Sequence, residues 1–170
     1  MSFKAINFKK WIDENRDKLK PPVCNQVIYK DNEDFIIMVV GGPNIRKDYH
    51  YNEGEEWFYQ LEGDMVLKLM VDGKPEDVEI KEGEIFLLPP RIPHSPQRFE
   101  NTIGLVIERY RTPEEKDAFL WYCDNCHNQL HKELVNLTDI VKQLPPLMQG
   151  FKENKKLRTC SKCGEFLELP

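Results

Sequence analysis

Hydrophobic and polar residues alternate in short runs along the first two thirds of the chain. Between about Cys24 and Arg111 these runs are rich in β-branched and aromatic residues, and turns containing glycine or proline separate them. The predicted strands read NQVIYK, DFIIMVV, KDYHYN, EEWFYQLEG, DMVLKLMV, DVEI, EIFLLPP and LVIERY. Many short strands at close spacing predict an all-β fold of the sandwich or barrel type, jelly rolls included.

Helical spacing appears at the two ends of the chain. Near the N-terminus one face of a predicted helix carries Phe8, Trp11, Ile12, Asn15 and Leu19, and Pro21-Pro22 ends it. Near the C-terminus a second short helix is predicted from Leu137, Ile140, Val141 and Leu144. Pro145-Pro146 should end this helix, and the following KENKK should be a solvated turn.

Composition changes near Thr112-Pro113, where four of the five cysteines still lie ahead. We therefore expect residues 1–112 to form the β domain with its N-terminal helix. Residues 113–170 should form a C-terminal extension.

Charge and composition exclude several classes of function. The chain has 170 residues, 40% of them hydrophobic, and a formal net charge of −5. This acidity argues against non-specific binding to nucleic acids or anionic membranes. The N-terminal segment lacks the apolar stretch of a signal peptide, and apolar runs such as FIIMVV are too short to span a membrane. We expect a cytoplasmic protein whose cysteines are reduced, which favours metal binding or catalysis over disulfides.

The segment HYNEGEE places His50 and Glu56 in an otherwise apolar part of the chain. Alternate side chains of a strand face the same side, so Glu56 should share its face with Phe58. A carboxylate facing a core needs a charged partner. Two histidines and one carboxylate, with positions left open, are the usual ligands of an oxygen-activating Fe(II), and His50, Glu56 and His94 supply that set. The alternative is a solvated hairpin loop, with His94 separately at the surface.

The same region resembles the two motifs of the cupin superfamily. Glu56 is followed after six residues by Gly63. Further on, Gly83, Pro89 and His94 stand at the spacing of the second cupin motif. This resemblance implies a jelly-roll barrel with a metal ion inside it.

Three positions depart from the usual cupin pattern. Asn52 stands where the second histidine of His-x-His is expected, Arg91 replaces a glycine, and Arg98 replaces a late asparagine. The expected ligand set therefore falls from three histidines and one glutamate to two histidines and one glutamate. That change indicates a facial triad with more open positions.

A closer resemblance is to the 3-hydroxyanthranilate 3,4-dioxygenase family, in its short bacterial and fungal form. It is carried by KPPV, VVGGPN-x-R-x-DYH, EEWFYQLEG, KEGEIFLLPPRIPHSPQR, LVIER and WYCDNC, and runs from about Trp11 to Cys163. The resemblance implies Fe(II) bound by His50, Glu56 and His94. The substrates would be 3-hydroxyanthranilate and O₂. The product, 2-amino-3-carboxymuconate semialdehyde, closes to quinolinate, a precursor of NAD.

The resemblance also assigns roles to pocket residues. Arg98 would bind the substrate carboxylate as a bidentate fork. Glu108 would accept a hydrogen bond from the substrate amine, and Arg46 would stabilise bound oxygen. Glu56 and Asn25 would also contact the substrate, and a homodimer is expected. The alternative for Arg98 and Glu108 is a buried structural ion pair.

Two CxxC knuckles, Cys123-x₂-Cys126 and Cys160-x₂-Cys163, predict a tetrathiolate metal site. Zn²⁺ and Fe both suit four sulfurs. Gly164 follows the second knuckle, and His127, in the matching place of the first, is a possible spare ligand. The alternative is thiol redox chemistry. The family resemblance implies a rubredoxin-like site distinct from the catalytic iron.

Cys24 lies outside both knuckles and should be a small core or pocket-edge residue. A cupin isomerase or thiol dioxygenase would need other polar groups in its pocket. A sensing or structural cupin would bind metal without consuming oxygen. A ribbon-type nucleic-acid module is the weakest rival, because the chain is acidic and lacks a basic-aromatic patch.

Overall fold

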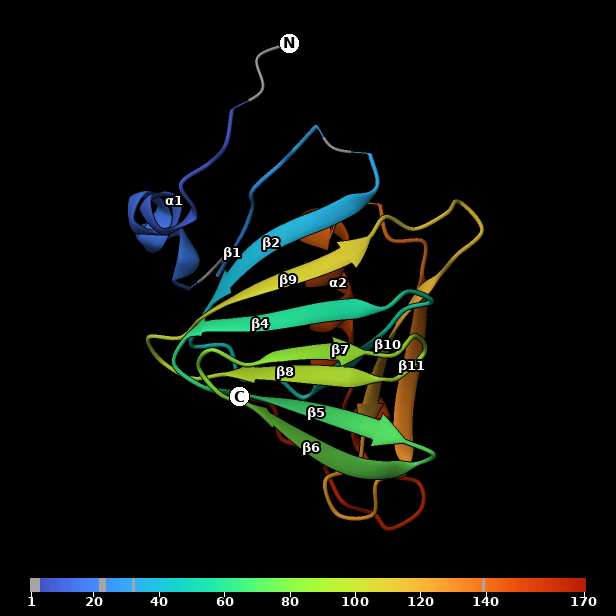
Figure 1. Ribbon diagram of the computed structural model, residues 1–170. Helices are drawn as coiled ribbons and strands as arrows, with labels where there is room; N and C mark the ends of the chain where they lie inside the picture. Colours follow the sequence, from blue (N-terminus) through green and yellow to red (C-terminus); the bar gives the residue numbers. More distant parts are fainter. Residues whose placement is uncertain (1–3, 22–23, 32, 139) are drawn as a thin grey trace.

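The chain forms two antiparallel sheets that face each other (Figure 1). The computed structural model describes residues 4–21, 24–31, 33–138 and 140–170. In order across the first sheet lie β1 (Asn25–Val27), β2 (Phe35–Gly41), β9 (Ile103–Arg109), β4 (Glu56–Glu62) and β7 (Ile85–Leu88). The second sheet consists of β11 (Gln129–Val135), β10 (Asp117–Tyr122), β3 (Asp48–Tyr51), β8 (His94–Arg98), β5 (Met65–Val71) and β6 (Lys74–Ile80).

The all-β prediction is confirmed, but the sheets do not close into a barrel. Within the described ranges, no ladder joins an edge strand of one sheet to an edge strand of the other. The edge strands themselves oppose closure, because β7 has only four residues and β6 reads KPEDVEI, with three carboxylates along it. The architecture is therefore an open two-sheet sandwich.

All eight strands predicted from the pattern are present, and β8 follows the extended segment around His94. Strands β10 and β11 were not predicted. The sequence of β10, DAFLWY, does not alternate because it is buried on both faces, whereas β11 is mostly polar. Since β10 pairs with β3 as well as with β11, the second sheet includes residues beyond 112. The division of the chain at residue 112 stays a prediction about folding units.

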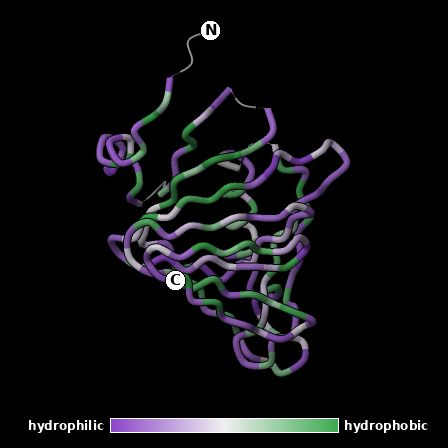
Figure 2. Tube along the Cα trace, viewed as in Figure 1, coloured by the Kyte–Doolittle hydropathy of each residue, from purple (hydrophilic) through white to green (hydrophobic). Residues whose placement is uncertain are grey.

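The predicted N-terminal helix is present as α1 (Phe8–Asn15), followed by the 3₁₀ helix η1 (Arg16–Leu19). The side chain of Asn7 caps it by accepting a hydrogen bond from the amide of Lys10 at 3.0 Å. Its apolar face packs Ile12 and Leu19 onto β2 and β9, and Figure 2 shows the rest of α1 as mainly hydrophilic. Pro22, part of the predicted stop signal, lies outside the described residues.

The prediction that Pro145-Pro146 ends the second helix is wrong, because α2 runs from Ile140 to Glu153 through both prolines. Each internal proline costs about 3 kcal/mol. The apolar face of α2 offsets this cost by packing Leu144, Leu147, Met148 and Phe151 against Phe119, Trp121 and Leu167. The KENKK residues are exposed as predicted, although Asn154 caps the short helix α3 (Lys155–Arg158) there instead of leaving a plain turn.

Two further apolar clusters hold the rest of the molecule together. One lies between the sheets and centres on Phe58, Leu67 and Val106. The other joins the extension to β10, where Trp121 and Phe151 stack with ring centroids 4.1 Å apart. No helix in the described part of the chain is long and apolar enough to cross a membrane.

Candidate active site and metal centres

Strand register brings His50, Glu56 and His94 together. His50 on β3 and His94 on β8 are ladder partners in the six-stranded sheet, and Glu56 begins β4 in the opposite sheet. The Glu56 Oε1 atom lies 3.4 Å from His50 Nδ1 and 3.2 Å from His94 Nε2. One donor atom from each residue lies within 4.8 Å of the others, so the three can share one ion. Their role as metal ligands stays a prediction.

The electrostatics of this cluster call for a cation. Glu56 is buried, which would raise the pKa of its carboxyl, but His94 and His50 hold that pKa well below its usual value. Burial would lower the pKa of His50, whereas hydrogen bonds to Asp117 and Glu56 raise it to about 9. Without a metal ion, a proton shared by His50 and Glu56 therefore offsets the negative charge of the buried carboxylate. A bound metal ion would take over that role. Two nitrogens and one carboxylate oxygen fit Fe(II) with open positions.

Glu108 lies directly opposite Glu56 in the β4–β9 ladder. Burial and the charge of Glu56 raise its pKa to about 7. Its Oε2 atom accepts hydrogen bonds from Arg111 Nη1 at 2.8 Å and from Asn52 Nδ2 at 3.3 Å, and the same amide donates to Glu56 Oε1 at 2.8 Å. The partner of Glu108 is therefore Arg111, and the alternative of an Arg98–Glu108 ion pair is wrong.

Arg98 is a buried cation on the same face of β8 as His94. Its Nη1 donates to Gln60 Oε1 at 3.1 Å, and no carboxylate of the described residues lies within ion-pair distance of it. Burial lowers its pKa to about 10, so it remains charged at neutral pH. Gly104 leaves room for this pair, because a Cβ there would lie 2.5 Å from Arg98 Nη1 and 2.7 Å from Gln60 Oε1 and would displace both side chains. This arrangement leaves the guanidinium available to an anionic ligand.

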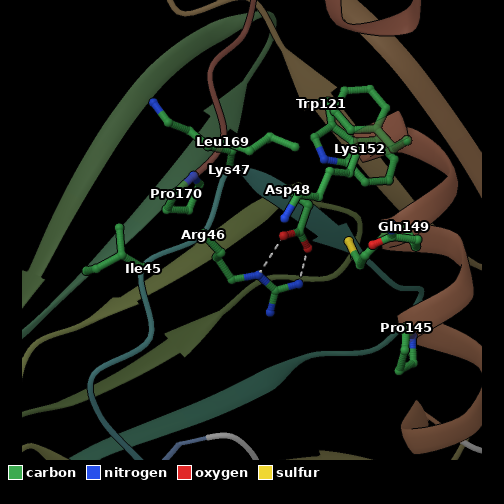
Figure 3. Close-up of a pocket in the computed structure, with 12 residues that line it drawn as sticks. Ile45, Arg46, Lys47, Asp48, Trp121, Pro145, Gln149, Lys152, Leu169 and Pro170 are labelled. Carbon is green, nitrogen blue, oxygen red and sulfur yellow. Dashed lines mark hydrogen bonds and ion pairs between the residues drawn. The ribbon is translucent and has the colours of Figure 1, made fainter. Parts of the chain in front are cut away.

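Arg46 is bound to Asp48, two residues along the chain, as Figure 3 shows. The pair lines a cavity of about 320 Å³ whose other walls include Trp121 on β10 and Gln149 on α2. Burial would lower the pKa of Arg46, but the charges of Asp48 and Glu56 raise it. The charge of Glu56 therefore stabilises the protonated form of Arg46. Its role toward oxygen stays a prediction.

Asn25 begins β1, and both β2 and β9 separate that strand from β4. Its contact with a substrate stays a prediction.

The structure adds three residues that the sequence did not single out: Gln60 against Arg98, and Arg111 and Asp117 behind the histidine cluster. One signal was available, since Asp117 is the single charge at the start of the apolar run DAFLWY.

The four knuckle cysteines also meet, at the end of β10. Sulfur–sulfur distances are 3.5 Å for Cys123–Cys163 and 3.6 Å for Cys126–Cys160, and all four donors lie within 4.8 Å. None of the five cysteines is in a disulfide. Four sulfurs on two knuckles fit a closed tetrahedral ion, which favours the metal site over redox chemistry.

The two knuckles have the same backbone turn. The amide of His127 donates to the Cys123 carbonyl at 3.0 Å, and that of Gly164 to the Cys160 carbonyl at 2.9 Å. His127 has φ +57° and Gly164 φ +81°, so histidine adopts the left-handed turn that glycine prefers. His127 is exposed and outside the sulfur cluster. Cys24 is buried beside the carbonyl of Pro43, as expected of a small core residue.

Comparisons with known proteins match nearly the whole chain. The family described as 3-hydroxyanthranilic acid dioxygenase matches residues 1–152. A 3-hydroxyanthranilate 3,4-dioxygenase from Xanthomonas oryzae pv. oryzae is 52% identical over 170 residues, covering 100% of this chain and 96% of the relative. One from Jannaschia sp. is 56% identical over 162 residues, covering 95% and 89%.

A solved structure, the polyketide cyclase RemF from Streptomyces resistomycificus, is 20% identical with a TM-score of 0.42, covering 73% of this chain and 80% of its own. The sequence relatives, by contrast, match along nearly the full length of the chain at about half of all positions. The chain belongs to the 3-hydroxyanthranilic acid dioxygenase family.

Proposed function

We propose that this enzyme uses O₂ to open the ring of 3-hydroxyanthranilate, giving 2-amino-3-carboxymuconate semialdehyde, which closes to quinolinate and feeds NAD synthesis. Family membership along the chain supports the reaction. Within the site, the observation that carries it is Arg98, a buried cation whose side-chain hydrogen bond goes to the neutral Gln60 and not to a carboxylate of the described residues. An aromatic acid would supply the missing carboxylate.

Fe(II) is the metal we propose for the cluster, held by His50, Glu56 and His94. When bound, Fe(II) would supply open positions for both the aminophenol substrate and O₂, and it would withdraw electron density from the substrate. The buried walls around these ligands limit access of water, since His94 is 2% exposed and Glu56 5%. The strands fix the three donors in place before any ligand arrives.

The remaining polar residues divide the work of holding the substrate. Arg98 binds the carboxylate, and Gln60 orients the guanidinium for it. Glu108 accepts a hydrogen bond or a proton from the substrate amine, and Asn52 keeps its carboxylate beside Glu56. We propose that Arg46 stabilises charge on oxygen, and that Glu56 and Asn25 complete the substrate contacts.

At the cysteine cluster we propose a structural Fe or Zn²⁺ that stabilises the extension, residues 113–170. It would fix the end of β10, because Cys123 follows directly on Tyr122, the last residue of that strand. The metal takes no part in ring cleavage in this proposal. With reduced thiols and no disulfide among the five cysteines, a cytoplasmic location is the proposal that suits the chain.

We also propose a homodimer, formed through the outer face of the five-stranded sheet. Ile85 and Leu87 on β7 are 62% and 53% exposed, and Trp57 on β4 is paired with Leu87 and with Ile107. A contiguous apolar strip of this kind favours burial against a second copy. Sedimentation of the wild type and of Leu87→Glu tests it: the variant should be a monomer, and two identical profiles would refute the face.

The proposed reaction is tested by loading the protein with Fe(II) without air, adding 3-hydroxyanthranilate, and then admitting oxygen. We expect oxygen uptake together with absorbance from the conjugated product. Metal binding without oxygen uptake would indicate a sensing or structural protein. Metal analysis of the same sample should give two ions per chain, one for each cluster, and a single ion would remove one of the two proposed sites.

A further inference from the structure

Asp117 forms a hydrogen bond with Nε2 of His50, the ring nitrogen that does not face Glu56. It begins β10 and is 1% exposed, and its Oδ2 atom lies 2.6 Å from His50 Nε2. Phe119, two residues on along the same strand, stacks on the imidazole with centroids 5.3 Å apart and is its ladder partner. The ring is thus fixed by a carboxylate at one nitrogen and by an aromatic face.

This contact decides which nitrogen of His50 faces the metal. A carboxylate only accepts hydrogen bonds, so Nε2 carries a hydrogen whether the ring is neutral or charged. The lone pair left for a cation is then on Nδ1, the atom that lies 3.4 Å from Glu56 Oε1. A strong acceptor behind a ligating histidine is the usual way of fixing its tautomer.

His94 is fixed in the opposite sense. Its Nδ1 lies 3.0 Å from the carbonyl oxygen of Ile92, which also only accepts, so Nδ1 carries the hydrogen. The free lone pair is on Nε2, which lies 3.2 Å from Glu56 Oε1. Two unrelated acceptors therefore leave, in each ring, the nitrogen nearest to Glu56 as the one that can bind a metal ion, and on His50 the ion would replace the proton that Nδ1 shares with Glu56.

Arg111 anchors Asp117. Its Nε and Nη2 atoms contact the two Asp117 oxygens at 3.1 and 2.8 Å, and its Nη1 contacts Glu108 Oε2 at 2.8 Å. This fork compensates the charge of a buried carboxylate. It also ties Glu108, on the substrate side, to the residue that orients His50. Asn52 links Glu108 to Glu56 on the other side.

We propose that Asp117 and Arg111 are positioning residues that set the tautomer and orientation of His50, so that His50 binds the metal through Nδ1 and His94 binds it through Nε2. The inference rests on the proposed metal site. It adds a claim about donor atoms and supporting residues that the reaction alone does not require.

The test of the donor atoms uses zinc, which is diamagnetic and does not react with oxygen. Imidazole ¹⁵N spectra of the full chain are recorded without and with Zn²⁺ in both clusters, with His50→Gln and His94→Gln used for assignment. We expect the coordination shift at Nδ1 of His50 and at Nε2 of His94. A shift at Nε2 of His50 would overturn the proposal.

The test of the supporting residues is metal affinity. With the cysteine cluster already filled with zinc, Asp117→Asn should weaken Co²⁺ binding at the other cluster about 10- to 100-fold. Arg111→Gln should weaken it less, and Arg111→Lys should recover part of the loss because the charge remains without the fork. Unchanged affinity in Asp117→Asn would refute the role.

The matched control is Glu115→Gln. Arg109 and Glu115 pair across the same β9–β10 turn as Arg111 and Asp117, but neither contacts the histidine cluster. We expect wild-type Co²⁺ affinity in this variant. If Asp117→Asn fails to fold, the wild-type ¹⁵N measurement still decides the donor atoms. These readouts need no turnover, so loss of the proposed reaction and loss of this inference are separate outcomes.

Discussion

The two metal centres are built in opposite ways. The cysteine cluster comes from two local turns with the same hydrogen bonds, and its ligands lie within three residues of each other in each turn. The histidine cluster takes one ligand from each of three strands in two sheets, and it exists only when the register of β3 with β8 is correct. The first centre can stabilise a local segment, whereas the second depends on the whole sandwich.

The charges at the two centres differ as well. The histidine cluster is surrounded by groups that adjust its charge: Asp117, Glu108, Asn52 and Arg111. The groups close to the sulfurs of the cysteine cluster are uncharged: backbone amides, such as that of Lys162 at 3.4 Å from Cys160 Sγ, and the side-chain amide of Asn125 at Cys163. Such a difference separates a reactive centre from a structural one.

Replacing Glu56 should abolish the reactive centre alone. In Glu56→Ala the only carboxylate ligand is lost, so we expect activity to fall on the order of 10⁴-fold or more, to background. Metal analysis should show one ion lost and the cysteine ion retained. Glu55→Ala, its exposed neighbour, is the control and should behave as wild type. Full activity in Glu56→Ala would remove Glu56 from the site.

Replacing Cys160 should have the reverse outcome. Cys160→Ser breaks the tetrathiolate, and we expect the free energy of unfolding to fall by roughly 4 kcal/mol or more, because loss of a structural metal has effects of this size. Hydrogen exchange should accelerate in residues 155–167. The iron of the other cluster should still bind.

Cys24→Ser is the control for that substitution, since Cys24 is buried away from the cluster. It should retain both metal ions and nearly wild-type stability. Equal stability of Cys160→Ser and wild type would mean that the extension is held by the Trp121–Phe151 packing without help from a metal.

Arg98 tests the substrate side of the reactive centre. Arg98→Met keeps much of the side-chain volume but removes the charge, so KM for 3-hydroxyanthranilate should rise about 10- to 100-fold with a smaller change in kcat. With 2-aminophenol, which lacks the carboxylate, wild type and variant should have similar KM. Arg91→Met, in an exposed arginine of the same segment, is the control. A loss that is equal for both substrates would refute the carboxylate role.

The contrast also explains what the sequence could predict. The cysteine site depends on local spacing, and the CxxC pattern was enough to find it. His50, Glu56 and His94 were found because strand parity and the family resemblance pointed to the same faces. Arg111 and Asp117 were missed because their function depends on β10, whose continuous apolar sequence showed no alternation. The course of α2 through Pro145-Pro146 was missed because packing against Trp121 and Phe119 outweighs the local signal.

The smallest effect concerns Glu108. Burial and the charge of Glu56 raise its pKa to about 7 in the metal-free chain. A carboxyl whose pKa is higher in the folded than in the unfolded protein binds its proton preferentially in the folded state. Its contribution therefore makes the metal-free protein less stable as the pH rises from about 4.5 to about 7. A metal ion on Glu56 should cancel part of the repulsion and lower the pKa of Glu108.

Carbon-13 spectra of labelled glutamate side chains measure this directly, with Glu108→Gln identifying the signal. We expect a titration midpoint near 7 without metal and a clearly lower one with Zn²⁺ in the histidine cluster. The shift should be absent when zinc fills only the cysteine cluster. The groups that set the pKa of Glu108 are Glu56, Arg111 and His50, and no cysteine is among them. A midpoint that ignores metal at the histidine cluster would show that Glu56 and Glu108 are not coupled. Glu108 would then accept the substrate proton with a basicity set by burial and Arg111 alone, and the two carboxylates would not act as one centre.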